Sequence, residues 1–187
     1  MDNTISKLLE YFKHITRDIF VYVLSGLLLI GNILLIDILY NSSLIFLHLK
    51  FITYLPLIII TTAYILGHII MGIMFICLEI IPIDEKITKY FNININQKNE
   101  IKVYKKNSSL YEYFIERQNQ LYYLRWNFAG AFLTSIIINI AIDYFTNIDI
   151  FSFIYIIEAL LFFILLILHY KTAKDYSSTI SNLLEEY

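Results

Sequence analysis

Charged residues, glycine, proline and cysteine are all scarce in this chain of 187 residues. Only 16% of the residues are charged, against roughly 25% in soluble domains, and the mean hydropathy is +0.64, so the composition is that of a membrane protein. The single cysteine, Cys77, excludes an intramolecular disulfide and a zinc site built on cysteines. A net charge of −2 provides no overall basic field, so direct binding of nucleic acid is not expected.

The common catalytic signatures are also missing. The chain has no nucleophile elbow, P-loop, zincin helix or dinucleotide fingerprint. No second histidine follows His68 after three or four residues, which gives a metal site little support. The N-terminal residues lack the order of a signal peptide, so we expect no cleavage there. The sequence therefore predicts no cofactor and no metal, and it favours a protein that is not an enzyme.

One long apolar run, Phe51 to Ile80, organises the chain. It holds no lysine, arginine or aspartate, and it is long enough to cross a hydrocarbon layer of about 30 Å. Three more runs of spanning length are Ile19 to Tyr40, Trp126 to Tyr144 and Ile150 to Tyr170. The sequence therefore predicts an all-α fold in which four transmembrane helices form a bundle.

The expected organisation adds helical extensions at both ends and a polar connector in the middle. Within the connector, Ile93 with Ile95 and Ile101 with Val103 alternate around a polar turn, which predicts a short β-hairpin. The expected divisions are a cytoplasmic amphipathic helix over 1–18, spans 1 and 2 over 19–80, a cytoplasmic connector over 81–121, spans 3 and 4 over 122–170, and a cytoplasmic helical tail over 171–187.

Three further patterns concern the helices themselves. Small residues in the first two spans permit close helix approach. These residues are Ser25, Gly26, Gly31, Ala63 and Gly67. A helix that begins near Leu110 is expected to continue unbroken into the third span. In the tail, apolar residues recur every three or four positions from Ala173 to Tyr187, a pattern that could pair helices.

The positive charges define the expected topology. Four spans put both termini and the connector on one side of the membrane, and that side receives every lysine and arginine except Lys50. Positive charge marks the cytoplasmic side of a membrane protein. Both termini are therefore predicted to be cytoplasmic, in a multi-pass protein of the bacterial inner membrane.

Ionisable side chains in the spans are the first candidate functional residues, because placing them in lipid is costly. His68 and Glu79 lie eleven residues apart, so they face the same direction on one helix. Glu79 is predicted to form an ion pair with Arg125 or Arg117; alternatively, each of these groups reaches interfacial water independently. His68 is predicted to be a gate, a pore-lining group, a proton relay or a catalytic base. The alternative is a neutral imidazole bonded to a carbonyl of a neighbouring helix.

A second group of polar residues lies toward the opposite end of the spans. Glu158, about eight residues inside the fourth span, is predicted to line a pore together with Asn139. If Asp37 and Asp143 converged with them, the four side chains would form an acidic vestibule that attracts cations. The favoured alternative places the two aspartates at the membrane interface.

Two short motifs carry a resemblance to a known group of proteins. YILGHIIMGIMFICLE, from Tyr64 to Glu79, and YYLRWNFAGAF, from Tyr122 to Phe132, resemble small multi-span membrane effectors of bacterial anti-phage and CRISPR-type defence systems. The resemblance covers the second and third spans. It implies an oligomer that disrupts the membrane after a cytosolic signal, which a separate sensor or nuclease partner would receive because the connector is too short for a sensing domain.

The leading functional hypothesis is an oligomeric pore or ion channel that perturbs the membrane when triggered from the cytoplasm. The expected partners are the lipid bilayer, further copies of the chain and a cytoplasmic sensor or nuclease. One alternative is an intramembrane lipid hydrolase or transferase with His68 as base and Arg125 holding a phosphate. Its candidate nucleophiles are Thr61, Thr62, Cys77 and Ser135. The other alternative is a membrane scaffold that recruits a cytoplasmic partner through the connector.

Overall fold

The computed structural model describes residues 2–40, 55–80, 83–93, 97–111, 115–146, 150 and 152–185. All regular structure in these residues is helical, which confirms the expected all-α class. The four long helices are α1 (Asp2–Leu39), α2 (Leu55–Met74), α6 (Glu116–Thr146) and α7 (Ser152–Glu185). The shorter elements are the π-helical turn η2 (Phe75–Ile80), α3 (Ile83–Tyr90), α4 (Gln97–Lys106) and α5 (Ser108–Leu110).

The long helices have the length and composition of membrane spans. The candidate spans are Ile19–Leu39, Pro56–Leu78, Glu116–Phe145 and Ser152–Glu185. Large apolar side chains on these helices point outward, as Phe153, Leu160 and Ile167 do on α7. Continuous apolar surface of this kind is unusual on a water-soluble monomer. The fold is therefore consistent with a multi-pass membrane protein whose outer surface contacts hydrocarbon.

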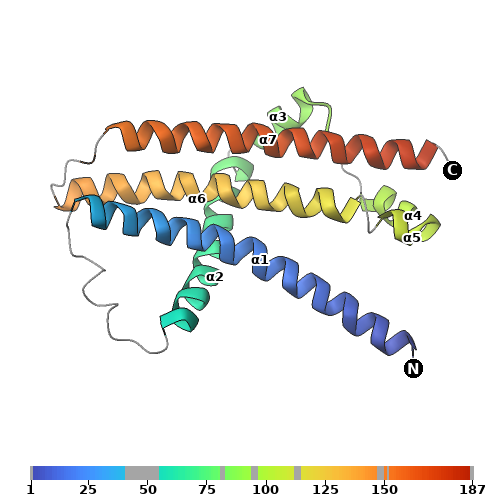
Figure 1. Cartoon of the computed structure of the whole chain (residues 1–187). Helices are drawn as coiled ribbons and strands as arrows, with labels where there is room; N and C mark the ends of the chain where they lie inside the picture. The colour runs from blue at the N-terminus through green and yellow to red at the C-terminus, as the bar shows by residue number, and fades with distance from the viewer. Residues whose placement is uncertain are drawn as a thin grey trace.

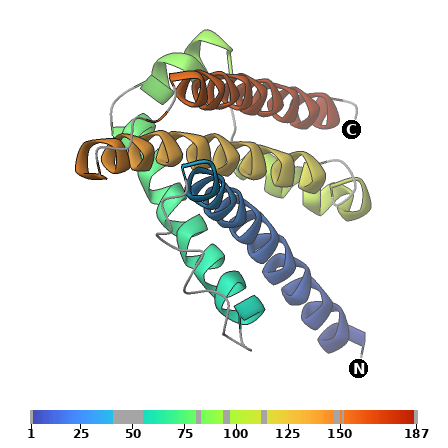
Figure 2. The ribbon, with the colours of Figure 1, turned by 60° about the vertical axis from the view of Figure 1, so that its left-hand side comes forward.

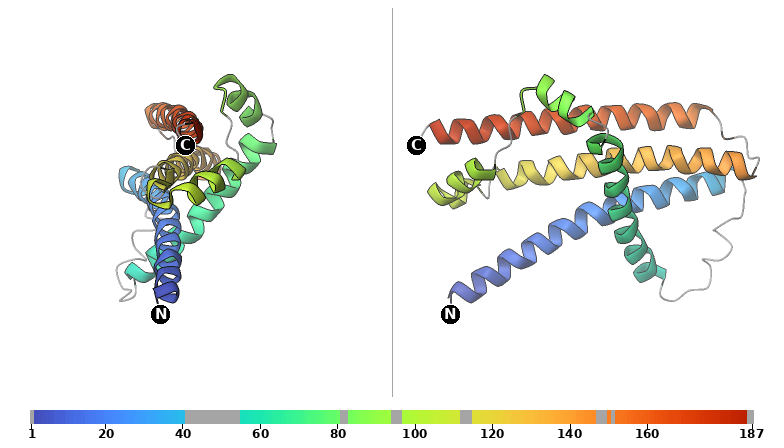
Figure 3. Two further views of the ribbon diagram at one scale, coloured as in Figure 1. Left: turned by 90° about the vertical axis from the view of Figure 1, so that its right-hand side faces the viewer. Right: turned by 180° about the vertical axis from the view of Figure 1, so that it is seen from behind.

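Three of the long helices run lengthwise, and the fourth crosses them. In Figure 1, α6 lies beside α7 in the opposite direction, with the C-terminal half of α1 on its other side. The N-terminal half of α1 diverges from α6. Helix α2 runs steeply across α1 and α6, as Figure 2 and both views of Figure 3 show. The arrangement thus differs from four helices that all run lengthwise.

Small residues bring the crossing helices α1 and α2 into close contact. A Cβ atom on Gly26 would overlap the backbone of Ala63, and a Cβ atom on Gly67 would overlap the backbone of Tyr22. With no side chain between them, the two backbones approach directly. The prediction that small residues permit close helix approach is therefore confirmed for Gly26, Ala63 and Gly67. A Cβ atom on Gly31 would meet nothing within 4 Å, so Gly31 takes no part in this contact.

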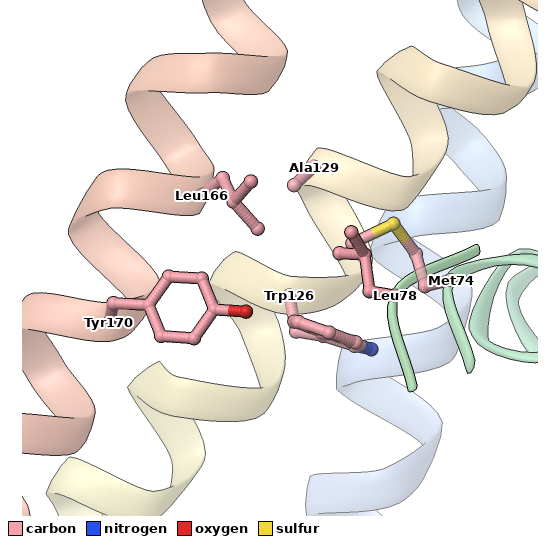
Figure 4. Close-up of a cluster of buried hydrophobic side chains, with 6 residues drawn as sticks. All are labelled: Met74, Leu78, Trp126, Ala129, Leu166 and Tyr170. Atoms are coloured by element: carbon pink, nitrogen blue, oxygen red, sulfur yellow. The ribbon is translucent and has the colours of Figure 1, made fainter. Parts of the chain in front are cut away.

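A cluster of buried apolar side chains joins α2 and η2 to α6 and α7. Figure 4 shows its six members: Met74, Leu78, Trp126, Ala129, Leu166 and Tyr170. Gly130, next to this cluster on α6, takes part in the contact because a Cβ atom there would overlap Met74 and Ile70 of α2. The cluster holds the crossing helix against the lengthwise pair.

The predicted hairpin in the connector was wrong. Ile101 and Val103 lie in α4, and Ile93 lies in an irregular segment after α3, while Ile95 falls outside the described residues. Val103 is buried at 3% exposure against Tyr176 of α7, whereas Ile101 is 53% exposed. A helix with one apolar side facing α7 explains this difference. The alternating pattern was too short to outweigh that tertiary contact.

Both terminal extensions are continuous with the neighbouring spans. Helix α1 includes the stretch expected as a separate helix over 1–18, and α7 includes most of the expected tail. In the tail, Ala173, Tyr176 and Ile180 are buried; the last two pack with Val103 of α4 and with Ile115. The apolar repeat of the tail is therefore used within one copy of the chain. The segment from Glu116 and the third span form the single helix α6.

Candidate functional site

The candidate site is the carboxyl group of Glu158, buried where α7 meets α6 and α1. Glu158 lies six residues after the start of α7 and is 3% exposed. Leu166 and His169 follow it eight and eleven residues later and are also buried, so all three share the stripe of α7 that faces α6. The periodicity of the helix therefore turns the carboxyl group inward, away from the lipid-facing apolar side chains.

Three neutral side chains from two other helices donate hydrogen bonds to this carboxyl group. Ser135 Oγ donates to Oε1 at 2.8 Å, and Asn139 Nδ2 donates to Oε1 at 2.9 Å and to Oε2 at 3.0 Å. From α1, Asn32 Nδ2 also donates to Oε1 and contacts Ser135 Oγ. Ser135 and Asn139 are fully buried and lie one turn apart on α6. The carboxyl group is thus solvated by protein dipoles from three directions.

The charge of Glu158 has no opposite charge beside it among the described side chains. Every hydrogen bond that the described residues give to Glu158 comes from a neutral hydroxyl or amide group. An uncompensated ion in a low-dielectric interior costs several kcal/mol even after the surroundings relax. A bound proton or a bound cation would remove that cost. The site is therefore suited to bind a small positive species.

Further buried polar side chains lie on α6 on both sides of this site. Asn127 is 2% exposed and Thr134 6% exposed, and each has an oxygen atom without a hydrogen-bond partner among the described residues. Asp143, half-buried, follows Asn139 one turn further on. From Asn127 to Asp143 the helix rises about 24 Å, which is close to the thickness of a hydrocarbon layer. Polar groups thus occur along most of the span.

The convergence of Asp37 and Asp143 with Glu158 and Asn139 stays a prediction. Asp37 is buried at 4% exposure on α1, five residues after Asn32. Thr61 and Thr62, candidate nucleophiles on α2, are exposed, and the hydroxyl of Thr61 donates to the carbonyl of Leu57. Of the predicted pore-lining residues, the structure brings Glu158 and Asn139 into direct contact.

His68 lies at the crossing of α1 and α2, on an exposed surface separate from Glu158. Its ring stacks on Tyr22 with a centroid distance of 3.8 Å, and Tyr64 meets it edge-on at 4.5 Å. Its Nδ1 atom lies 3.0 Å from the carbonyl oxygen of Tyr64. That carbonyl belongs to the same helix and not to a neighbouring one. The proposed gate and lining roles of His68 remain predictions.

Arg125 contacts α7 in the described structure. Its Nη1 atom donates to the carbonyl of Leu168 at 3.0 Å and also to the hydroxyl of Thr172. The side chain of Glu79 lies outside the described residues, and Arg117 is exposed on α6. The predicted ion pair of Glu79 with Arg125 or Arg117 therefore remains a prediction.

The sequence reasoning missed His169, although it lies in the fourth apolar run. Its ring is 1% exposed and packs on Tyr122 at 4.1 Å and on Trp126 at 4.6 Å. Its Nδ1 atom lies 3.0 Å from the carbonyl oxygen of Tyr122. The eleven-residue spacing from Glu158 was the available signal, because it places both ionisable groups on one face of α7. His68 and Glu79 in the second span have the same eleven-residue spacing.

Comparison with known proteins identifies no relative of this chain. No protein-family model matches the chain, and searches of curated proteins and of solved structures find no similar protein. The class that the fold and site define is a helical protein with four candidate membrane spans and a buried carboxyl group between three of its helices.

Proposed function

We propose that the protein is an ion-conducting protein of the membrane, with Glu158 in the conduction path. The observation that supports this most strongly is a carboxyl group at the meeting of three helices whose hydrogen-bond donors, in the part of the chain that the structure describes, are all neutral. Acidic groups inside membrane spans are expensive, and where they occur they mark ion and proton pathways. A group needed only to hold the helices together would not require a charge.

The polar side chains along α6 support the same proposal. Asn127 and Thr134 lie on the cytoplasmic side of Glu158 in the expected topology, and Asp143 lies on the other side. A conduction path needs polar partners at several depths, because an ion that leaves one group must reach the next. Buried hydroxyl and amide groups from Asn127 to Asn139, spread over about 18 Å, and Asp143 one turn further on meet that need.

The conducting form is proposed to be a homo-oligomer. Side chains fill the space between helices in contact, so the few helices of one copy enclose no wide aqueous channel. Copies that associate through their apolar outer surfaces would align several Glu158 sites around one path. The outward-facing side chains of α2, including Ile58, Ile65 and Ile69, offer such a surface.

The biological role follows from the topology and the resemblance. A conducting oligomer in the bacterial inner membrane, with both termini in the cytoplasm, would depolarise the cell when a cytosolic signal opened it. A sensor or nuclease partner would act on the connector, whose helices α3 and α4 contact α7. The proposal is thus a membrane-perturbing effector of bacterial defence.

Purified protein in liposomes tests the proposal. Ion flux is measured with entrapped dyes for the wild type, for Glu158→Gln and for a control, Asp175→Asn, an exposed carboxylate on the same helix. We expect flux that falls at least tenfold in Glu158→Gln and is unchanged in the control. Equal flux through the wild type and Glu158→Gln would remove Glu158 from the path. An intact membrane potential in cells that express the protein under phage challenge would remove the conduction proposal.

The contacts of His68 with described residues give no support to the alternative of a lipid hydrolase. Among these residues its ring contacts Tyr22, Tyr64 and a carbonyl of its own helix. Of the candidate nucleophiles, Ser135 is hydrogen-bonded to Glu158 and Thr61 to a backbone carbonyl. A general base must lie within hydrogen-bond reach of the group that it activates.

A further inference from the structure

We infer that the species bound at Glu158 is a proton, and that the protein conducts protons in preference to metal ions. This inference rests on the proposed function and names the ion.

A divalent metal ion does not suit the site. Calcium takes six to eight oxygen ligands, several of them carboxylates. Glu158 contributes the only carboxylate among the side chains that are hydrogen-bonded in the cluster. In the described part of the chain, no group of three or more histidine, cysteine, aspartate or glutamate side chains is placed to hold a metal. A divalent ion here would leave an excess positive charge in the membrane.

Sodium and potassium are disfavoured by the direction of the hydrogen bonds. Ser135, Asn139 and Asn32 all present hydrogen atoms to the carboxyl oxygens, so each dipole has its positive end toward Glu158. A metal cation needs several oxygen atoms pointing at it, so all of these groups would have to reverse together. A proton needs one acceptor only, which the reversal of a single group can supply. The site as arranged solvates a carboxylate that has released its proton.

The protonated state also has a partner available. Asn139 Oδ1 is buried without a hydrogen-bond partner among the described residues, while Nδ2 of the same amide donates to Glu158. A half-turn of the amide would exchange the two atoms and let Oδ1 accept the O–H of a protonated Glu158. On uptake an O–H bond forms at a carboxyl oxygen; on release it breaks and the amide turns back. Both states are thus hydrogen-bonded.

Titratable groups on the packed elements provide the outer approach to this site. Asp143 on α6 lies one turn beyond Asn139, Asp37 on α1 lies five residues beyond Asn32, and Tyr155 precedes Glu158 by three residues on α7. Toward the cytoplasm, Thr134 and Asn127 are buried polar groups that water could join. Acidic side chains at successive depths, linked by hydroxyl and amide groups, are suited to pass protons.

The first test is ion selectivity in liposomes. Vesicles with an entrapped pH dye and an imposed potassium diffusion potential report proton uptake, and sodium and potassium fluxes are measured separately. We expect proton flux at least tenfold above sodium or potassium flux, lost in Glu158→Gln and retained in part in Glu158→Asp. Sodium or potassium flux that depends on Glu158, without proton flux, would overturn the inference and leave the proposed function standing.

The second test does not depend on conduction. Dicyclohexylcarbodiimide is an apolar reagent that adds to protonated carboxyl groups, and mass spectrometry of peptides locates the adduct. We expect Glu158 in the detergent-solubilised protein to be labelled at least fivefold more than the exposed Asp175 of the same helix, because the reagent adds to a carboxyl group that holds a proton in an apolar site. Absence of the label from Glu158 would overturn the inference. This readout needs no ion conduction, so its failure is distinct from a failure of the proposed function.

Discussion

The contact between α6 and α7 has two polar regions that are built differently. Toward the cytoplasmic end in the expected topology, Arg125 of α6 donates to the carbonyl of Leu168, and His169 of α7 is bonded to the carbonyl of Tyr122. Each helix thus gives a side chain to the backbone of the other. Around Glu158, by contrast, every hydrogen bond between the described residues joins one side chain to another.

This difference separates a structural contact from a functional one. A backbone carbonyl of a helix cannot turn, so the bonds of Arg125 and His169 fix the register of the two helices. Hydroxyl and amide groups rotate about their side-chain bonds, so the partners of Glu158 can exchange donor for acceptor. We call the contacts of Arg125 and His169 the inner region, and the contacts of Glu158 the outer region. We expect changes in the inner region to lower stability, and changes in the outer region to alter conduction.

The largest effect on stability is expected from His169→Ala. The ring is 1% exposed and packs between Tyr122, Trp126 and Tyr170, so truncation leaves a cavity. The free energy of unfolding should fall by about 3 kcal/mol, measured by thermal or denaturant unfolding in detergent. His68→Ala is the matched control: an exposed histidine should lose less than about 1 kcal/mol. Equal losses of unfolding free energy at the two histidines would contradict the stabilising role of the inner region.

A smaller loss is expected from Arg125→Met, which keeps the length of the side chain and removes its hydrogen bonds. Hydrogen bonds between membrane helices contribute about 0.6 kcal/mol each on average, and those to charged groups about 1.5 kcal/mol or more in soluble proteins. Loss of the bonds to Leu168 and Thr172 should therefore cost about 1.5 kcal/mol. Arg117→Met, at an exposed position of the same helix, should leave unfolding unchanged. A rescue of Arg125→Glu by Glu79→Arg would instead support the predicted ion pair.

Apolar runs were sufficient to predict an all-α fold with four long apolar helices, because hydrocarbon places strong demands on composition; the topology drawn from the positive charges stays a prediction. Close helix approach at small residues of the first two spans was also predictable, although not which small residues would meet. The steep crossing of α2 was not, because the direction in which two helices cross depends on side chains from both. The hairpin failed because Val103 packs on α7, a contact far away in the sequence.

The candidate site was predictable in part. Glu158 and Asn139 were chosen because polar groups in spans are costly, and they prove to be in contact. Ser135 is only a candidate nucleophile in the sequence, and nothing there singles out Asn32, because one sequence does not show which helices are adjacent. Once α1, α6 and α7 are placed together, both residues become partners of Glu158.

A moderate effect, larger on conduction than on stability, is expected from Ser135→Ala. This change removes one donor to Glu158 from the proposed conduction path. A lost hydrogen bond of about 1 kcal/mol corresponds to about a fivefold fall in proton flux. The free energy of unfolding should fall by about 0.6 kcal/mol, the average for a hydrogen bond between membrane helices, and Ser152→Ala, at an exposed position on α7, should change neither quantity. A loss of stability without a loss of flux would make the outer region structural.

The smallest effect is expected from Tyr170→Phe, at the point where α7 contacts α3 of the connector. The hydroxyl of Tyr170 donates to Asp84 Oδ1 at 2.6 Å, and its ring lies parallel to that of Phe91 at 6.2 Å, so α3 is held on α7. Tyr170→Phe keeps the ring contact and removes the hydrogen bond, which should cost about 0.6 kcal/mol. Hydrogen exchange at the amides of α3 should then be about threefold faster, with α6 and α7 unchanged, because only the local opening of α3 becomes easier. Tyr90→Phe, at a tyrosine that is 82% exposed, is the control. Faster exchange throughout α7 would mean that the bond to Asp84 stabilises the helix pair itself, and that the two regions of the α6–α7 contact differ less than their hydrogen bonds indicate.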